Sequence, residues 1–429
     1  MSTGMGDAPH EHDLFDDDDD FRTVVDTSFW SQPAVPDYPP LAHFGRFEIL
    51  GRLARGGMAE IYLARDWDDQ RKARHLVVKR VLPEMEDNPD LLRMFLEEGR
   101  TAVRLYHTNV CHVYECGEID GTTFMALEWV WGPQLHDVVE RMVSRDGCIP
   151  WPIAVEIVAQ VAGALHYVHN AKGTGGKPLG IVHRDVSPHN IMMSWGGQVK
   201  LLDFGIAKTS GDATTGGATV GKYGYMSPEQ AQSRSVDQRS DIFALGIVLF
   251  EALTGTPLYD RPTLLDTLQA IVREPVPSLR AVRPELPEAL EHVVKRALAK
   301  EPEHRFQSAG ELRAALKQVL RTHGQAVTEQ RIALFLDGLF SEEEKLPLKG
   351  RAKLTGSFQA LTAMGAAAVR GEDVTYEQFD HSSPSAHPPP LAPRKKKPLF
   401  SGWVAWVALT ALAAVMACLG AFAAIYLIR

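Results

Sequence analysis

Two short clusters of polar residues in the middle of the chain could together support phosphoryl-transfer chemistry. The first is the run His183-Arg184-Asp185-Val186-Ser187-Pro188-His189-Asn190, and the second is Asp203-Phe204-Gly205. The apolar segment Val199-Lys200-Leu201-Leu202 between them predicts a short strand. In this arrangement Asp185 can act as a base, and Asn190 and Asp203 can hold a metal ion beside a phosphoryl group. Either cluster alone occurs by chance, but both together rarely do.

On these two motifs the chain resembles a bacterial serine/threonine protein kinase of the eukaryotic-like, Hanks-type family. The resemblance implies a two-lobed α+β fold, with a β-rich N-lobe over about residues 44–130 and a helical C-lobe. It also implies that ATP and Mg²⁺ bind between the lobes, that Asp185 accepts the proton of a protein hydroxyl, and that Asn190 and Asp203 hold the metal. The expected partners are ATP and protein substrates, and no nucleic acid.

A lysine and a helical carboxylate complete the family pattern upstream. The segment His75-Leu76-Val77-Val78-Lys79 predicts a strand that ends in Lys79, which the resemblance assigns to the phosphates of ATP. Residues 91–100 have helical apolar spacing and contain two acids. The family pattern makes Glu98 the partner of Lys79, whereas Glu97 is expected on the solvated face of the helix.

The loop that covers the phosphates departs from the family's G-x-G-x-x-G. The stretch Leu53-Ala54-Arg55-Gly56-Gly57-Met58-Ala59-Glu60-Ile61 puts alanine at the first and third glycine positions. We expect ATP binding to survive, because alanine is the smallest change from glycine. The residues predicted to contact the nucleotide are Leu53, Ala54, Arg55, Gly56, Gly57, Met58, Ala59, Ile61, Lys79, Asn190 and Asp203, with Glu128 and Val130 in the hinge that follows Leu127.

Two further departures lie beside the catalytic aspartate. Ser187 stands where serine/threonine kinases carry a lysine, and Lys222 stands where they carry a threonine before the segment Tyr225-Met226-Ser227-Pro228-Glu229. Since the two family positions face each other, the hydroxyl and the ammonium look exchanged, which makes Ser187 and Lys222 candidate catalytic residues. Divergence in an inactive enzyme is the alternative.

Two matches to the family are structural. Asp241 matches the aspartate that binds backbone N–H groups of the catalytic loop, and Arg305 matches the arginine that pairs with Glu229. Both predict a complete C-lobe.

Length and charge divide the remainder of the 429-residue chain. The kinase domain is predicted over residues 44–321. Residues 1–43 contain ten acidic residues and one basic residue, which accounts for the whole net charge of −9, and they predict an acidic disordered tail. Residues 326–341 predict an amphipathic helix appended to the C-lobe, and residues 342–402 predict a Pro-rich and basic linker.

Residues 403–428 contain no charged side chain and predict one transmembrane helix at the C-terminus. The run Arg394-Lys395-Lys396-Lys397 precedes this span and only Arg429 follows it, so the kinase domain is expected on the cytosolic side of the cytoplasmic membrane. Ala413, Ala417 and Ala421 recur at an interval that lets helices approach closely. Pairing into a homodimer and plain anchoring are the two alternatives for the span.

The sequence leaves rival functions open. Ala54, Ala59, Ser187 and Lys222 favour a membrane-tethered pseudokinase scaffold, whereas the intact set of Lys79, Glu98, Asp185, Asn190 and Asp203 favours an enzyme. A kinase acting on small molecules is disfavoured by the segment before Glu229.

We also expect phosphorylation in the loop 206–220 to act as a switch, because a phosphate there could pair with Arg184.

Overall fold

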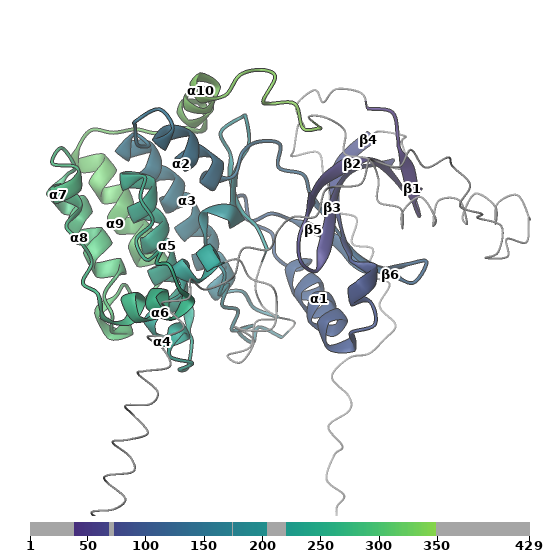
Figure 1. Cartoon of the computed structure of the whole chain (residues 1–429), viewed down its shortest axis with the longest axis horizontal. Helices are drawn as coiled ribbons and strands as arrows, with labels where there is room; N and C mark the ends of the chain where they lie inside the picture. The colour runs from purple at the N-terminus through teal and green to yellow at the C-terminus, as the bar shows by residue number, and fades with distance from the viewer. Residues whose placement is uncertain (1–37, 68–72, 174, 204–219, 349–429) are drawn as a thin grey trace, which may run out of the picture. The chain divides into compact units, whose positions relative to one another are not determined.

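The computed structural model describes residues 38–67, 73–173, 175–203 and 220–348, and these residues fold into two lobes. Figure 1 shows a sheet and helix α1 (Pro89–Ala102) in one lobe and helices α2 to α10 in the other. The predicted two-lobed kinase fold is therefore confirmed. The segments 1–37 and 349–429, with most of the predicted tail and linker and the whole predicted span 403–428, lie outside the described residues.

The N-lobe is built on one antiparallel sheet of six strands in the order β1-β2-β3-β4-β6-β5. Strand β4 is central, and its Lys79 pairs with Ile61 on one side and with Met125 on the other. The functional lysine therefore sits on a strand that is held on both edges. The strands are β1 (Ala42–Phe44), β2 (Phe47–Arg55), β3 (Ala59–Trp67), β4 (Ala73–Val81), β5 (Val113–Ile119) and β6 (Thr122–Glu128).

Helix α1 packs against β5 and presents the predicted carboxylates. The side chain of Asn88 caps the helix by accepting a hydrogen bond from the backbone of Leu91. A Cβ added at Gly99 would lie 2.7 Å from Cys116 Cβ, so this glycine allows the helix to approach the sheet closely. Glu97 is exposed, as predicted, and Glu98 is half-buried one residue further along.

Helices α3 and α5 form the centre of the C-lobe, and most of their side chains are buried. Among the described residues, α3 alone is long and apolar enough to cross a membrane, but most of it is buried against its neighbours in the lobe. The helices are α2 (Leu135–Val143), α3 (Trp151–His169), α4 (Pro228–Ala231), α5 (Gln238–Thr254), α6 (Leu264–Arg273), α7 (Leu279–Val282), α8 (Glu288–Ala297), α9 (Ala309–Thr322) and α10 (Glu329–Leu339).

The short strands β7 (Ile191–Met193) and β8 (Val199–Leu201) form a hairpin between the two sequence motifs. Short 3-10 helices complete the described elements. They are η2 (Pro83–Met85), η3 (Pro188–Asn190), η5 (Val220–Tyr225) and η6 (Pro302–His304).

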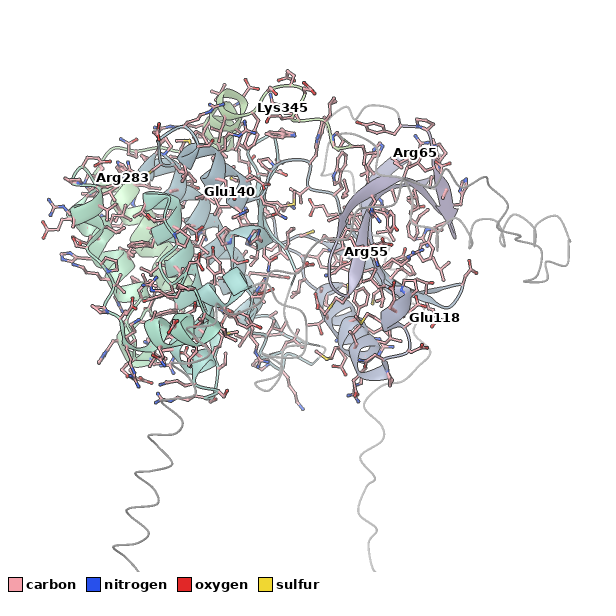
Figure 2. The ribbon with its side chains drawn as sticks, viewed as in Figure 1. Arg55, Arg65, Glu118, Glu140, Arg283 and Lys345 are labelled. Carbon is pink, nitrogen blue, oxygen red and sulfur yellow. The ribbon has the colours of Figure 1, made fainter. Side chains whose placement is uncertain are left out.

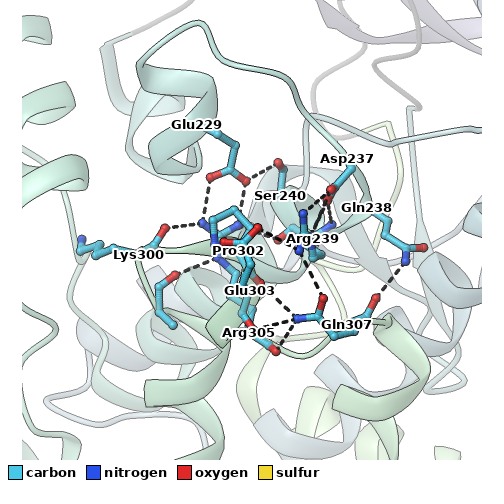
Figure 3. Close-up of polar contacts among 11 residues, drawn as sticks. Glu229, Asp237, Gln238, Arg239, Ser240, Lys300, Pro302, Glu303, Arg305 and Gln307 are labelled. Carbon is cyan, nitrogen blue, oxygen red and sulfur yellow. Dashed lines mark hydrogen bonds and ion pairs between the residues drawn. The ribbon is translucent and has the colours of Figure 1, made fainter.

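A buried ion pair fixes the segment that precedes α4. Arg305 donates from Nη1 to Glu229 Oε1 at 2.7 Å and from Nη2 to Oε2 at 2.8 Å, and Figure 3 shows the same guanidinium reaching the backbone near Lys300. Burial alone would raise the pKa of Glu229, but Arg305 and Ser240 hold this pKa below its ordinary value. The pair predicted from the sequence is therefore confirmed.

After α9 the chain continues to pack against the kinase domain. Helix α10 lies within the predicted appended helix, buries Ile332, Leu336 and Leu339, and contacts α2. From its end, residues 341–348 run toward the strands of the N-lobe (Figure 1), where Leu348 is buried beside Leu50 and Leu63. This part of the predicted linker is therefore packed against the domain.

Candidate active site

A cavity of about 940 Å³ lies between the lobes and contains many of the predicted residues. Strands β2, β3 and β4 supply its N-lobe side, and Met192 and Leu202 supply apolar contacts from the C-lobe. A cleft of this size and mixed lining is typical of a cofactor site. The predicted residues that line it are Leu53, Ala54, Ile61, Lys79, Glu128, Val130 and Asp203.

Lys79 extends from β4 toward Asp203, with Nζ 3.0 Å from Oδ1. Burial alone would lower the pKa of Lys79, but the carboxylates of Asp203, Glu98 and Asp185 raise this pKa above its ordinary value. The ammonium is therefore charged at neutral pH. Asp203 forms an ion pair with Lys79 that was not predicted, and the charge of Glu98 acts on the same ammonium, so a direct contact of Glu98 with Lys79 stays a prediction.

The catalytic loop is held by Asp241 at the start of α5. Its carboxylate accepts hydrogen bonds from the backbone N–H groups of His183 and Arg184, both at 2.8 Å, which confirms the predicted role. Arg184 has a φ of 62° and Asp203 a φ of 42°, in the left-handed region that costs energy for residues other than glycine. Such strain persists only where neighbouring contacts impose it.

Asn190 fixes the position of Asp185. Its amide nitrogen donates to the backbone oxygen of Asp185 at 2.7 Å and to the carboxylate Oδ2 at 3.0 Å. The imidazole of His183 lies 2.9 Å from the backbone oxygen of Leu202, which links this loop to the residue before Asp203. The two sequence motifs are therefore joined in space by hydrogen bonds across the β7–β8 hairpin.

The residues fit a magnesium ion that is shared with phosphates. Because the amide nitrogen of Asn190 is bonded to Asp185, its amide oxygen is the atom that could contact a metal. The carboxylate of Asp203 is 38% exposed, so it can be reached. No cluster of three or more His, Cys, Asp or Glu occurs in the part of the chain that the structure describes. Mg²⁺ is usually bound by one or two protein oxygens, and water and phosphate oxygens complete its coordination.

The loop between β2 and β3 is open on its outer side. The backbone N–H of Gly56 donates to the oxygen of Ala59 at 2.8 Å and closes the turn, and an added Cβ at Gly57 would meet no atom within 4 Å. Ala54 lines the cavity, whereas Ala59 is buried in the sheet opposite Val81. Contact of Arg55, Gly56, Gly57, Met58 and Ala59 with phosphates stays a prediction, since none of them lines the cavity.

The segment 128–132, called here the hinge, carries residues that sequence reasoning missed. The Glu128 carboxylate pairs with the buried Lys200 at 2.7 Å and accepts a hydrogen bond from the backbone of His112 at 3.1 Å. Trp129 and Trp131 stack with centroids 5.6 Å apart, and both line the cavity. In the sequence, the close spacing of Trp129 and Trp131 was the only indication that these two residues contribute to the site.

Ser187 is buried beside the catalytic loop, and its backbone oxygen accepts a hydrogen bond from Asn190 at 3.0 Å. Lys222 belongs to η5, but its side chain lies outside the described residues. The predicted exchange between these two positions therefore stays a prediction. The same holds for the loop 206–220, of which residues 206–219 are not described.

Comparison with known proteins agrees with this geometry. Residues 47–320 match the family model of the protein kinase domain. Tyrosine-protein kinase MasK of Myxococcus xanthus is 36% identical over 330 residues, which are 76% of this chain and 51% of MasK. Serine/threonine-protein kinase PknB of Mycolicibacterium smegmatis is 38% identical over 292 residues, which are 66% of this chain and 44% of PknB.

A solved structure is also similar. The crystal structure of the Mycobacterium tuberculosis PknI kinase domain has a TM-score of 0.50 and 30% identity, and the match covers 65% of this chain and 97% of that domain. The chain spans about half the length of MasK and PknB.

Proposed function

This chain belongs to the protein kinase family, and we propose on that premise that it transfers the γ-phosphoryl group of ATP to hydroxyl groups of proteins. One observation carries the proposal. The Lys79–Asp203 ion pair and the Asp185–Asn190 pair belong to one connected site, because the charge of Asp185 acts on Lys79. A charged lysine, an oriented carboxylate and two metal-binding oxygens are the groups that phosphoryl transfer requires.

Each residue has a proposed task. Asp185, oriented by Asn190, accepts the proton of the attacking hydroxyl, and Lys79 binds the phosphates of ATP through its ammonium. Glu98 strengthens the charge on Lys79. Backbone groups of Glu128 and Val130 bind the adenine ring. Magnesium, when bound by Asn190 and Asp203, would neutralise charge that develops on the phosphate oxygens.

Serine and threonine are the proposed acceptors. The mycobacterial relatives are described as serine/threonine-protein kinases. The segment Tyr225-Met226-Ser227-Pro228-Glu229 also resembles the serine/threonine pattern rather than the tyrosine pattern. Tyrosine is the second candidate, because MasK is described as a tyrosine-protein kinase and matches 76% of this chain. Serine/threonine kinases carry a lysine at the position where this chain has Ser187, and this difference keeps tyrosine as a candidate acceptor.

A non-catalytic scaffold is the rival function. Alanines at positions 54 and 59 favour it, but the described geometry of Lys79, Asp185, Asn190 and Asp203 supports catalysis. A scaffold would not need an ammonium and an oriented base in the same cleft.

We further propose that residues 403–428 anchor the chain in the cytoplasmic membrane, with the kinase domain in the cytosol. The support is the uncharged length of the segment and the basic run Arg394-Lys395-Lys396-Lys397 before it. A homodimer through the small residues of the span is a further proposal.

The experiment that tests the activity uses the full chain in detergent, labelled ATP, magnesium and a generic basic protein. Phosphoamino-acid analysis of the products then identifies the acceptor. Phosphoserine or phosphothreonine supports the first candidate, and phosphotyrosine alone supports the second. No product in any protein would favour the scaffold.

A further inference from the structure

Residues 341–348, called here the hinge strap, cross from the C-lobe to the N-lobe outside the hinge. Their composition, Ser-Glu-Glu-Glu-Lys-Leu-Pro-Leu, is that of a linker. Figure 1 shows the segment running from the end of α10 toward the sheet, and Lys345, labelled in Figure 2, lies on it. The contacts of the strap decide whether it is a passive connection.

Helix α2 and the turn that follows it hold the C-lobe end of the strap. Arg145 donates at 2.8 Å to the backbone oxygen of Leu339, the last residue of α10 before the strap, and Arg141 forms an ion pair with Glu344 in the strap. Glu344 also accepts a hydrogen bond from the backbone N–H of Ser341 at 3.0 Å. The bond from Ser341 and the charge of Arg141 lower the pKa of Glu344 to about 2, so its carboxylate is ionised at neutral pH.

The middle of the strap is bonded to the hinge itself. The indole nitrogen of Trp131 donates to the backbone oxygen of Lys345 at 2.7 Å. Trp131 in turn stacks on Trp129 with an interplanar angle of 19°. The ammonium of Lys345 bonds to Asp337 and Glu342, which holds its backbone in place. A displacement of the strap would therefore disturb the segment that lines the nucleotide cavity.

The N-lobe end of the strap is an apolar anchor. Leu348 is 9% exposed and packs with Leu50 and Leu63 from β2 and β3. A Cβ added at Gly51 would lie 2.6 Å from Leu348 Cδ2. The absence of a side chain at Gly51 thus forms the seat for Leu348, on a strand that continues into the phosphate loop.

Between these anchors, Leu346 and Pro347 line the same cavity as Lys79 and Val130. The strap therefore touches both lobes, the hinge and the nucleotide site. We infer that the hinge strap holds the lobes at the separation that ATP requires, with Leu348 as its positioning residue and with Leu346 and Pro347 forming an outer wall of the site. This inference rests on the proposed function, because it assigns the cavity to ATP.

The inference makes a specific statement about kinetics. Loss of the anchor lets the lobes separate and opens the outer wall, so ATP binds more weakly. The groups around the reacting phosphoryl, Asp185 and Asn190, are held by contacts that do not include the strap. Turnover at saturating ATP should therefore change less than the KM for ATP.

The test measures the affinity of the full chain for Mg-ATP by equilibrium binding. Leu348→Asp places a charge in the apolar seat and should weaken binding about tenfold, equivalent to about 1.4 kcal/mol. Gly51→Val fills the seat from the opposite side and should do the same without changing the strap. Leu348→Met keeps an apolar anchor of similar volume and should bind ATP as the wild type does.

A matched control is Leu334→Asp, since Leu334 is a leucine on α10 that is 73% exposed and lies outside the strap. It should leave ATP binding unchanged. The combination of Leu348→Asp with Gly51→Val should weaken binding no more than either change alone, because both remove one contact.

Unchanged ATP affinity in both Leu348→Asp and Gly51→Val would overturn the inference, and so would equal losses of kcat and of affinity. Failure of the wild type to bind ATP would overturn the proposed function as well, so the two failures are distinguishable. Hydrogen exchange of the strap gives an independent result. The backbone amides of Lys345, Leu346 and Leu348 should be protected further by Mg-ATP in the wild type, and those of Lys345 and Leu346 should not be in Leu348→Asp.

Discussion

Lys79 reaches Asp203 from the opposite side of the cleft, with its ammonium 3.0 Å from the carboxylate. The pair joins the central strand of the N-lobe sheet to the residue that follows the β7–β8 hairpin of the C-lobe. Further carboxylates at Glu98 and Asp185 act on the same ammonium and raise the pKa of Lys79 despite its burial. The site thus keeps a positive charge beside the atoms proposed to hold magnesium and phosphate.

Lys79→Met should abolish most of the activity while the domain stays folded. Removal of the ammonium takes away a charge that stabilises the transferred phosphates, and loss of one such group costs about 10²–10³ in rate. The measurement is kcat/KM for ATP in the full chain. The control is Lys177→Met, which makes the same change at an exposed lysine distant from Lys79 in the sequence. Equal activity in the two variants would contradict the role of Lys79.

The two motifs and the strand that carries Lys79 were sufficient to predict the fold class. The contacts of Asp241 with the catalytic loop and of Arg305 with Glu229 were also predictable, because these residues match positions of the kinase family that the chain resembles. The ion pair of Lys79 with Asp203 was not predicted, because it depends on how the two lobes are placed in the folded protein.

No pattern in the sequence indicated that the hinge strap packs against the domain. Only Leu346 and Leu348 are apolar between polar residues, which gives no helical or strand period. The seat for Leu348 depends on Gly51, almost 300 residues earlier, so it exists only in the folded protein. The Glu128–Lys200 pair was missed for the same reason, since nothing in either local sequence indicates the other residue.

Glu229→Gln should destabilise the domain in a pH-dependent way. Removal of one partner of a buried ion pair costs about 3–5 kcal/mol, because the charge of Arg305 stays buried. The folded protein holds the pKa of Glu229 below its ordinary value of 4.5. The stabilisation is therefore present above pH 4.5 and is lost as the pH falls through the lower, folded-state pKa.

Denaturant unfolding at several pH values measures this effect. The difference in free energy of unfolding between the wild type and Glu229→Gln should be largest near neutral pH and should shrink below pH 4.5. A difference that stays constant or grows toward acid pH would contradict the account.

Ser187 and Lys222 should behave as one functional unit. If Lys222 supplies the contact to the γ-phosphate, Lys222→Thr alone should be severely impaired, and Ser187→Lys combined with Lys222→Thr should recover part of the loss. Residues in contact couple by about 0.5–3 kcal/mol, which a double-mutant cycle on kcat/KM can resolve. Strictly additive effects would show that the two positions were not exchanged.

Deletion of residues 403–429 should release the chain from the membrane fraction. The segment 403–428 has no charged residue, whereas α3, the apolar helix of the described domain, is buried inside the C-lobe. Fractionation of cells that express the full and shortened chains measures the distribution. If the shortened chain stays in the membrane fraction, this segment is not the anchor.

The most direct test of the central claim compares phosphate transfer by the wild type with transfer by Asp185→Asn. The substitution keeps the size of the side chain and its place beside Asn190, but it removes the proposed base. Both proteins are incubated as full chains with labelled Mg-ATP and a basic protein, and a binding assay shows that both still take up ATP. The account predicts robust transfer by the wild type and a loss of at least about 10²-fold in Asp185→Asn. Equal transfer by the two proteins, or none by either, would contradict it.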